Sequence, residues 1–462
     1  MPDIIQARVL KGFRDYLPEA EIERKALLEI LERKFRSFGF VPIDTPSLEY
    51  AEILLGKGGG ETDKQVYRFR DHGDRDVALR FDLTVPFARF MAEHVDELYL
   101  PFRRYHMAKV WRGENTQRGR YREFMQCDFD IVGTDAASSD ADIILLIDSA
   151  LAALDIGSFT IRINHRGLFN RFLATIGASD KGPEVLRAVD KLDKVGTLEV
   201  ERILRAEIGD EAAIKVLDYI TPENGFASTL AKLERLSGGK NPDSDRLRAI
   251  WEEVCASSAA NDETLESAGQ KQEEKSSILV ELPAKPGKLV LDPSITRGLD
   301  YYTGVVFETR LDEMTEIGSV CGGGRYNELA SLYTTRKLPG VGAAIGLDRL
   351  LAALEVLGKT KGRAGYTEVL VLAIEESFGP RYQALASATR KAGLSCEVYP
   401  EKKKLGQQFA YAERKGIPLA YILGGSEAEK GIIVLKDLRN RESLEASSAS
   451  AIAALAKERL GK

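Results

Sequence analysis

Two strand-like runs, residues 101–112 and 121–132, stand on either side of a short polar loop that is rich in arginine. A loop this short joins antiparallel strands, because parallel neighbours need a crossover of about a dozen residues or more. Further strand patterns occur at residues 64–83 and 288–333, and an amphipathic helix is predicted at 19–38. The sequence therefore favours a largely antiparallel sheet flanked by helices over a doubly wound parallel sheet.

The chain is too long for a single ordinary core, since 462 residues usually divide into two or three domains. Strand patterns dominate residues 1–164 and 286–360, whereas residues 165–285 between them are charged and helical in pattern. After the linker KTKGRAG, residues 366–462 alternate between strands and helices, which is typical of a small α/β domain. We expect one domain in two separated parts, a helical insertion and a C-terminal α/β domain.

Charge is distributed unevenly along the chain. The formal net charge is −6, but residues 366–462 carry 15 Lys and Arg against 12 Asp and Glu, so this end has a net charge of +3 and the remainder −9. A basic end on an acidic chain could contact a polyanion, although solvated charged faces are common.

Several features predict a cytoplasmic protein. The N-terminus MPDIIQARVLKGFRDYLPEA lacks the basic segment and apolar run of a signal peptide, and no stretch of about 18 apolar residues could span a membrane. The four cysteines are scattered without a C-x-x-C pair, which predicts neither disulfides nor a zinc site. The four histidines lack metal-ligand spacing and are expected to be structural or exposed, so we expect no metal bound by the protein alone.

The two strands around the arginine-rich loop carry the densest chemistry in the chain. Strand alternation puts Phe124, Gln126, Asp128 and Asp130 on one face of the second strand, opposite Arg112 at the end of the first. Arginine can bind phosphate oxygens in bidentate fashion and an aromatic ring can stack on a base, so this combination suits a nucleotide. The alternative is an exposed hairpin stabilised by salt bridges, and charge alone favours that alternative.

Two glycine-containing segments predict close approach of the backbone to a ligand. RGLDYYTGVVFE places an arginine, an aspartate and two tyrosines between glycines, and CGGGRYNEL leaves space beside its strand. An edge strand with its turn would explain the first segment equally well. GVGAAIGLDRL starts as a strand and brings Arg349 near a helix start, where a single arginine is usually a solvated surface residue.

Seven segments in a fixed order resemble the histidyl-tRNA synthetase family of class II aminoacyl-tRNA synthetases. They are KGFRDYLP, GFVPIDTPSLE, RFDLTVPFARF, the hairpin WRGE…RGRYREFMQCDFDIVG, RGLDYYTG, CGGGRYNEL and GVGAAIGLDRL. The resemblance implies a class II antiparallel sheet, a helical insertion and an anticodon-binding C-terminal domain. It implies a homodimeric ligase that activates histidine with ATP and Mg²⁺ to histidyl-adenylate, and then transfers histidine to the 3′ end of its tRNA.

The same resemblance implies a binding site for each small substrate. The residues implied to contact ATP are Arg112, Glu114, Arg120, Phe124 and Arg349, and those implied to contact histidine are Asp82, Leu83, Thr84, Arg112, Gln126, Asp130, Arg297, Tyr301 and Tyr302.

Specific roles follow from these positions. Arg112 and Arg297 are implied to act on the reacting α-phosphate, while Phe124 stacks on adenine and Arg349 binds the γ-phosphate. Since a carboxylate nucleophile is already ionised, the chemistry requires positioned positive charge rather than a protein base.

The histidine positions divide between the two ends of the substrate. Asp82 and Thr84 match positions that bind the α-amino group, and Leu83 lies between them in the same loop. Gln126, Asp130 and Tyr302 match positions that bind the imidazole and nearby atoms. A neutral imidazole has one donor and one acceptor nitrogen, which an acid and a tyrosine hydroxyl can contact together. Many relatives have glutamate instead of Asp82 and Asp130, so the contact distances differ here while the roles are expected to remain.

Two other functions fit parts of this pattern. The synthetase-like regulatory subunit of ATP phosphoribosyltransferase resembles the same fold, but typically lacks the C-terminal domain and the ATP-binding arginines. A tRNA-sensing module within a stress kinase would require a kinase signature, which the sequence does not contain. The presence of Arg112, Arg297, Arg349 and residues 366–462 favours the ligase.

Overall fold

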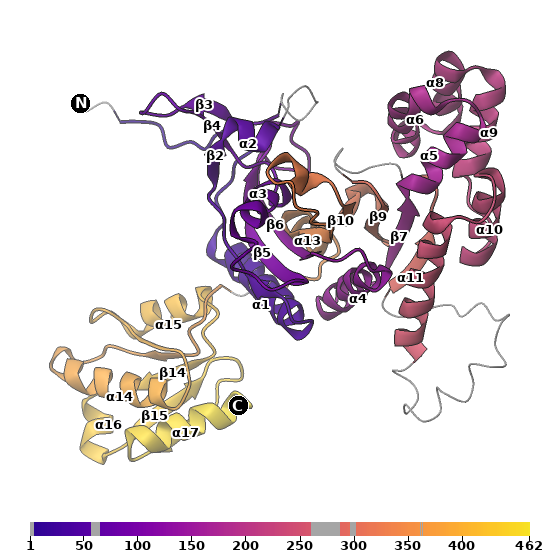
Figure 1. Ribbon diagram of the computed structural model, residues 1–462. Coiled ribbons are helices and arrows are strands. Elements are labelled where there is room, and N and C mark those ends of the chain that lie inside the picture. Colours follow the sequence, from indigo (N-terminus) through magenta and orange to yellow (C-terminus); the bar gives the residue numbers. More distant parts are fainter. Residues whose placement is uncertain (1–3, 57–64, 260–286, 296–301, 361, 363) are drawn as a thin grey trace. The chain divides into compact units, whose positions relative to one another are not determined.

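The computed structural model describes residues 4–56, 65–259, 287–295, 302–360, 362 and 364–462 (Figure 1). It contains two compact units. The first comprises Met1–Arg14 and Leu27–Lys359, and the second comprises Asp15–Ala26 and Thr360–Lys462. Within the described ranges, no helix is both long and apolar enough to cross a membrane.

The first unit is built on an eight-stranded sheet in the order β1-β5-β6-β11-β10-β9-β7-β8. Its five central pairings are antiparallel, and only the two outermost pairings, β1 with β5 and β7 with β8, are parallel. The expected antiparallel sheet is therefore confirmed. The strands are β1 (Val41–Pro42), β5 (Phe102–Trp111), β6 (Glu123–Val132), β7 (Phe159–His165), β8 (Gly287–Leu291), β9 (Val305–Leu311), β10 (Ser319–Tyr326) and β11 (Gly340–Gly346).

Helices from both ends of the first unit's sequence cover this sheet. On α1, the predicted apolar positions Leu27, Leu31 and Phe35 are buried, and the Phe35 ring lies 5.0 Å from that of Phe129 on β6. This ring contact fixes the C-terminal half of α1 against the hairpin strands. The helices around the sheet are α1 (Pro18–Ser37), α2 (Ala51–Leu55), α3 (Thr84–His94), α4 (Ala137–Ala153) and α13 (Leu347–Val356).

A small three-stranded sheet lies beside α2 and α3 in the order β2-β4-β3 (Figure 1). Its strands are β2 (Leu48–Tyr50), β3 (Arg68–Arg70) and β4 (Asp76–Leu79). The two short strands expected within residues 64–83 correspond to β3 and β4, which pair antiparallel across a five-residue turn.

The stretch between β7 and β8 is helical in its described part and forms a lobe of its own (Figure 1). A 3-10 turn lies in this lobe at Ser179–Lys181, and two others lie on either side of β10 at Thr315–Ile317 and Leu329–Leu332. The helices of the lobe are α5 (Arg166–Thr175), α6 (Gly182–Val189), α7 (Leu192–Val195), α8 (Thr197–Ile208), α9 (Asp210–Ile220), α10 (Phe226–Leu236) and α11 (Pro242–Ala259). The Tyr219 ring stacks 4.3 Å from that of Phe172, which ties α9 to α5 in a core of the lobe's own.

The second unit contains a five-stranded mixed sheet in the order β13-β12-β14-β15-β16. Its strands are β12 (Val369–Val371), β13 (Cys396–Val398), β14 (Leu419–Ile422), β15 (Ile433–Asp437) and β16 (Ser443–Ala446), and its helices are α14 (Gly379–Lys391), α15 (Leu405–Arg414), α16 (Gly425–Lys430) and α17 (Ala449–Arg459), with a 3-10 turn at Glu376–Phe378. Buried apolar side chains on both faces of β12 give this unit an independent core.

Candidate active site

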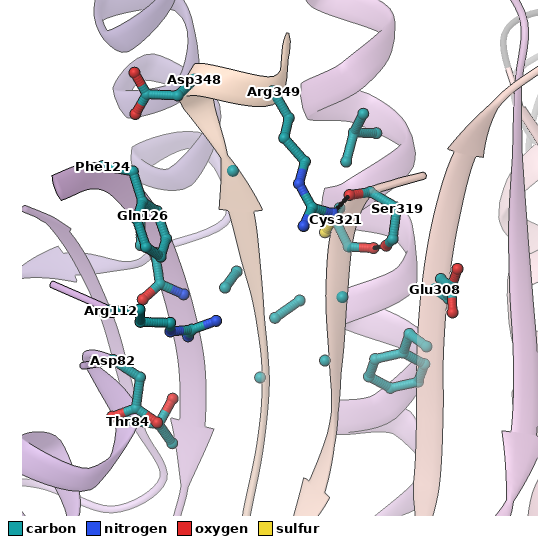
Figure 2. A pocket seen from close by; sticks show the side chains of 18 of the residues that line it. Asp82, Thr84, Arg112, Phe124, Gln126, Glu308, Ser319, Cys321, Asp348 and Arg349 are labelled. Carbon is teal, nitrogen blue, oxygen red and sulfur yellow. Dashed lines mark hydrogen bonds between the residues drawn. The ribbon is translucent and has the colours of Figure 1, made fainter. Parts of the chain in front are cut away.

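One pocket of about 260 Å³ opens in the middle of the first unit's sheet, between the β5–β6 hairpin and the start of α13 (Figure 2). Its walls come from segments far apart in sequence, because β6 and β10 both pair with β11. The residues expected from the sequence that line it are Asp82, Thr84, Arg112, Glu114, Arg120, Phe124, Gln126, Asp130, Tyr302 and Arg349. Leu83 is fully buried and does not line the pocket, and Arg297 and Tyr301 lie outside the described residues.

The β5–β6 hairpin brings a cation and an aromatic ring together. Its strands pair with Val110 opposite Phe124 and with Ala108 opposite Gln126. The guanidinium carbon of Arg112 lies 5.2 Å from the centre of the Phe124 ring, and its Nε donates a 2.8 Å hydrogen bond to the carbonyl oxygen of Phe81. An arginine fixed in this way can meet a phosphate while the ring stacks on a base.

The hairpin also carries surface ion pairs, as the salt-bridge alternative expected. Lys109 Nζ lies 2.6 Å from Glu123 Oε1, and Arg120 Nη1 lies 3.4 Å from Glu114 Oε2. However, Glu114 and Arg120 also line the pocket together with Arg112. The hairpin is therefore both ion-paired and part of a cavity wall, and the purely exposed interpretation is wrong.

The acidic end of the pocket begins at the start of α3. Asp82 precedes the helix, and its Oδ1 accepts a 3.0 Å hydrogen bond from the backbone amide of Val85. A carboxylate at this place satisfies one of the unpaired amides of the first helical turn and is favoured by the helix dipole. In Figure 2, Asp82 and Thr84 lie together on the side of the pocket near Arg112, where they could bind a cationic amino group.

Asp130 lies deep in the pocket wall and is held by two residues that the sequence analysis did not single out. The Tyr326 hydroxyl donates a 2.5 Å hydrogen bond to Asp130 Oδ1, and Arg104 Nη2 lies 2.7 Å from Asp130 Oδ2. Arg104 is fully buried, its guanidinium lies 4.1 Å from the Phe87 ring, and its Nη2 also donates a 3.4 Å hydrogen bond to the carbonyl oxygen of Leu83. Burial raises the pKa of the Asp130 carboxyl, while Arg104 and the Tyr326 hydroxyl oppose that rise.

Asp128 shares a strand face with Asp130 but plays a different part. It is buried and does not line the pocket, so its place on the predicted face does not make it a ligand residue. Burial raises the pKa of its carboxyl well above the usual value, and the charges of Asp130 and Asp82 add to the increase. Since Gln126 and Asp130 on either side of it do line the pocket, sequence periodicity identifies the face of a strand but not which side chains on that face reach the cavity.

Glycines form the floor of the pocket. A side chain at Gly342 would overlap Asp130 Oδ1, and one at Gly323 would overlap the carbonyl oxygen of Gly342. The two glycines lie on neighbouring strands, where Gly323 is opposite Ala343 and Gly342 is opposite Gly324. The space predicted beside CGGGRY is therefore present, and it is required for the strands and Asp130 to approach as closely as they do.

Arg349 lies in the first turn of α13 at the other end of the pocket. Its Nη1 donates a 2.5 Å hydrogen bond to the carbonyl oxygen of Ser319, the contact drawn in Figure 2. The preceding Asp348 accepts a 2.7 Å hydrogen bond from the backbone amide of Met125 through its Oδ2. The helix start is thus tied to both β10 and β6, which places Arg349 as a pocket residue rather than a solvated surface arginine.

His72 is exposed and His94 is half-buried, whereas the other two histidines lie inside the protein. His106 and His165 are buried, and burial lowers the pKa of each imidazole to about 4, so both are neutral at physiological pH. In the described part of the chain, no group of three or more His, Cys, Asp and Glu side chains is arranged to hold a metal ion.

Tyr326 and Arg104 were not predicted as residues of the site, but the sequence around Tyr326 does contain an indication of its role. It lies within the quoted segment CGGGRYNEL, and a tyrosine that follows glycines on a strand is well placed to reach a neighbouring side chain. Arg104 carried no such signal, because a basic residue in a strand pattern normally indicates a solvent-facing position.

The pocket combines cations and a ring at one end with carboxylates and tyrosines at the other. It can therefore hold an anionic, base-containing molecule next to a smaller polar one that carries a positive charge.

Comparisons with known proteins agree with this arrangement. A family model described as histidyl-tRNA synthetase matches residues 12–350, and one described as anticodon binding domain matches residues 368–458. The chain is 47% identical over 466 residues to the histidine–tRNA ligase of Treponema denticola, with 98% of each chain covered.

Solved structures show the same likeness. The crystal structure of histidyl-tRNA synthetase from Nostoc sp. PCC 7120 has a TM-score of 0.83 and 32% identity, covering 99% of this chain and 100% of that one. The structure of an ATP phosphoribosyltransferase regulatory subunit/histidyl-tRNA synthetase from Bacillus halodurans C has a TM-score of 0.69 at 21% identity, covering 89% and 97%, and shares the fold.

Proposed function

Because the chain belongs to the histidyl-tRNA synthetase family, we propose that the pocket between the β5–β6 hairpin and α13 is where it activates histidine. The protein is a histidine–tRNA ligase, which joins histidine to its tRNA at the expense of ATP. The observation that carries the assignment of the pocket is the convergence of ten expected residues, from both sequence ends of the catalytic unit, on one cavity.

ATP occupies the hairpin end of the pocket in this proposal. Adenine stacks on Phe124, Arg112 binds the α-phosphate, and Arg349 binds the γ-phosphate, while Glu114 and Arg120 help to fix the nucleotide. The 5.2 Å separation of the Arg112 guanidinium from the Phe124 ring supports this, because it places a phosphate ligand next to a stacking surface.

Histidine occupies the acidic end. Its amino group binds Asp82 and Thr84, its carboxylate faces Arg112, and its imidazole binds Asp130 and Tyr302, with Gln126 between the two ends. Tyr301 and Leu83 complete this proposed set, Leu83 through its backbone. Since Asp130 accepts hydrogen bonds and a tyrosine hydroxyl can donate or accept, the pair can contact both nitrogens of a neutral imidazole.

The reaction then needs alignment more than proton transfer. The histidine carboxylate attacks the α-phosphorus, the new P–O bond forms histidyl-adenylate, and the bond to diphosphate breaks. Arg112 and Arg297 are proposed to stabilise the negative charge that builds up on the α-phosphate oxygens. The ribose hydroxyl at the 3′ end of the tRNA next attacks the adenylate carbonyl carbon and releases AMP.

We propose that Mg²⁺ accompanies ATP as it binds. Mg²⁺ is usually held by one or two carboxylates together with phosphate oxygens and water. The carboxylates of Glu114 and Glu308 line the pocket and are suited to that role. The ion would neutralise phosphate charge during attack and departure.

The regulatory-subunit alternative predicts binding of histidine without activation. It is disfavoured by the pocket positions of Arg112 and Arg349 and by the separate core of residues 366–462. Exchange of diphosphate into ATP should depend on histidine and proceed at a rate typical of a synthetase, and tRNA with the histidine anticodon should be charged. Absence of histidine-dependent exchange would refute the proposed activation site.

A second experiment compares the charging of histidine tRNA transcripts with and without an extra 5′ guanylate. It would show whether the enzyme requires that nucleotide, for which the loop Gln117–Arg122 is the proposed contact.

We propose a functional division of the chain into three parts. Residues 1–164 and 286–360 form the catalytic domain, residues 165–285 its helical insertion, and residues 366–462 the anticodon-binding domain. The match of a family model described as anticodon binding domain to residues 368–458 supports the last of these.

We also propose a cytoplasmic homodimer. Large apolar side chains at Leu48, Tyr50 and Phe69 are more than one-third exposed on the small β2-β4-β3 sheet, which is typical of a surface that another chain covers. The four cysteines are free thiols, in agreement with a reducing compartment.

Three lysines in the second unit are proposed to bind tRNA phosphates. Lys402–Lys404 form the turn before α15, and the buried Gln408 fixes this turn by donating 2.8 Å hydrogen bonds to the carbonyl oxygens of Lys403 and Ala373. Replacing all three lysines by alanine should raise the KM for tRNA. It should also make the plot of log KM against log salt concentration less steep, by about 0.7–0.9 in slope for each phosphate that the lysines no longer neutralise. Histidine-dependent diphosphate exchange should not change.

The matched control replaces three exposed lysines on α14, α16 and α17, Lys391, Lys430 and Lys457, by alanine, and its salt slope should equal that of the wild type. An unchanged salt slope in the triple variant would show that Lys402–Lys404 form only a solvated turn. Substitution is a better test than truncation near residue 363, because Asp15–Ala26 belong to the same compact unit as Thr360–Lys462.

A further inference from the structure

The N-terminal segment Lys11–Arg14 contacts the arginine-rich loop of the hairpin, although the proposed chemistry assigns it no role. The carbonyl oxygen of Gly12 accepts a 2.8 Å hydrogen bond from the backbone amide of Arg122. Gly12 has a φ of +87°, and a Cβ atom there would lie 2.6 Å from Arg122 Cγ and 2.9 Å from Thr116 Cγ2. Only glycine allows the segment to lie this close to the loop.

Arg14 reaches from this segment to two walls of the pocket. Its Nη1 donates a 2.9 Å hydrogen bond to the hydroxyl of Tyr121 in the loop, and its guanidinium carbon lies 4.4 Å from the centre of the Tyr121 ring. Its Nη2 lies 3.6 Å from Oδ1 of Asp348 on α13. Tyr121 and Asp348 both line the pocket, so one guanidinium connects the loop with the helix.

These two walls meet next to Arg349, which is proposed to bind the γ-phosphate of ATP. Asp348 directly precedes Arg349, and its other oxygen accepts the amide of Met125 at 2.7 Å. On the loop, Gly119 lies so close to α13 that a Cβ atom would be 3.3 Å from Cα of Arg349. A shift of the loop would therefore displace Arg120 and change the space in front of Arg349.

We propose that Arg14, seated by Gly12, is a positioning residue that holds the loop Gly119–Tyr121 against α13 and so shapes the ATP end of the pocket. The inference rests on the proposed ATP site. It assigns a function to the segment KGFRD without requiring Arg14 to touch the substrate. Since Tyr121 and Asp348 belong to the ATP end of the pocket, histidine binding should not depend on Arg14.

Arg14→Met tests this by steady-state diphosphate exchange. We expect the KM for ATP to rise about tenfold, the factor that corresponds to about 1.4 kcal/mol, while the KM for histidine stays within about twofold, the scatter of an indirect effect. Arg14→Lys keeps the charge facing Asp348 but loses the planar contact with Tyr121, so it should lie between the wild type and Arg14→Met. Arg8→Met, which changes an exposed arginine three residues before that segment, is the matched control and should equal the wild type.

A second measurement detects the loop position without activity. Trypsin should cut after Arg118 and Arg120 faster in Arg14→Met than in wild type, as mapped by mass spectrometry. Apart from the site after residue 14, which the substitution removes, cleavage elsewhere should be unchanged. An unchanged KM for ATP and unchanged cleavage in Arg14→Met would overturn the inference while leaving the ATP site intact. An equal increase in both KM values would also overturn it, since that indicates general destabilisation. Wild-type protein without histidine-dependent exchange would instead refute the proposed function. If Arg14→Met fails to fold, Arg14→Lys and its cleavage pattern decide between the same outcomes.

Discussion

Replacing Arg297 by alanine should slow formation of histidyl-adenylate by about 10²–10³-fold, because one preorganised donor to a developing oxyanion is typically worth about 2.7–4 kcal/mol. Arg297 lies outside the described residues, and its role is proposed from the segment RGLDYYTG. Single-turnover formation of adenylate, measured by quenched flow, gives the chemical step directly. Histidine binding, measured by calorimetry, should weaken far less than the rate.

The control for this variant is Arg336→Ala. Arg336 is also an arginine of the catalytic unit, but it is half-exposed and forms a 2.6 Å ion pair with Asp96 at the surface. Its removal should leave the adenylation rate unchanged, since Arg336 does not line the pocket and its ion pair is exposed to solvent. Near-normal single-turnover rates in Arg297→Ala would exclude this residue from the α-phosphate site.

Replacing Asp130 by asparagine should reduce the free energy of unfolding by about 3–5 kcal/mol, the usual cost of leaving one member of a buried ion pair without its partner. Arg104 is fully buried, and its Nε and Nη1 have no hydrogen-bond partner among the described residues, so Asp130 supplies its closest countercharge. The variant should also bind histidine poorly. Urea unfolding of the purified protein measures the first effect and calorimetry the second.

The double variant Asp130→Asn, Arg104→Met separates these two effects. It removes both charges, so it should recover most of the lost stability without recovering histidine binding. Tyr302→Phe is the comparison in which only binding should fall, by about 1–3 kcal/mol, because it removes one hydrogen-bonding group from the proposed imidazole site. Equal stability of Asp130→Asn and the wild type would show that Arg104 does not depend on this carboxylate.

Much of the fold could be predicted because its signals are local. The alternation in residues 101–112 and 121–132 corresponds to β5 and β6, and the amphipathic pattern at 19–38 corresponds to α1. In the second unit, α16 and β16 were not predicted. They contain six and four residues with mainly polar sequences, and segments this short lack the periodicity on which such predictions depend.

Residues of the site were predicted only where they lie in segments that resemble the family. Phe124 and Arg349 were placed at a nucleotide by the resemblance, and both line the pocket. The support around Asp130 was not predicted. Arg104 lies directly opposite it on the neighbouring strand β5, and Tyr326 approaches from a strand 196 residues further along the chain. The contact of Arg14 with Asp348 likewise joins the two sequence ends of the catalytic unit. Such pairings depend on strand order and register, which the sequence pattern does not specify.

The glycine floor also determines how this enzyme could be engineered. Charging tRNA with enlarged imidazole analogues requires extra volume, and no volume can be gained at Gly323 or Gly342, where the side chain is already absent. A side chain at Gly342 would displace Asp130, and one at Gly323 would overlap the backbone of β11. A library for noncanonical amino acids should therefore keep both glycines fixed and vary the side chains of the walls, with Gln126 as the first choice because its removal disrupts neither the strand pairing nor the buried Arg104–Asp130 pair.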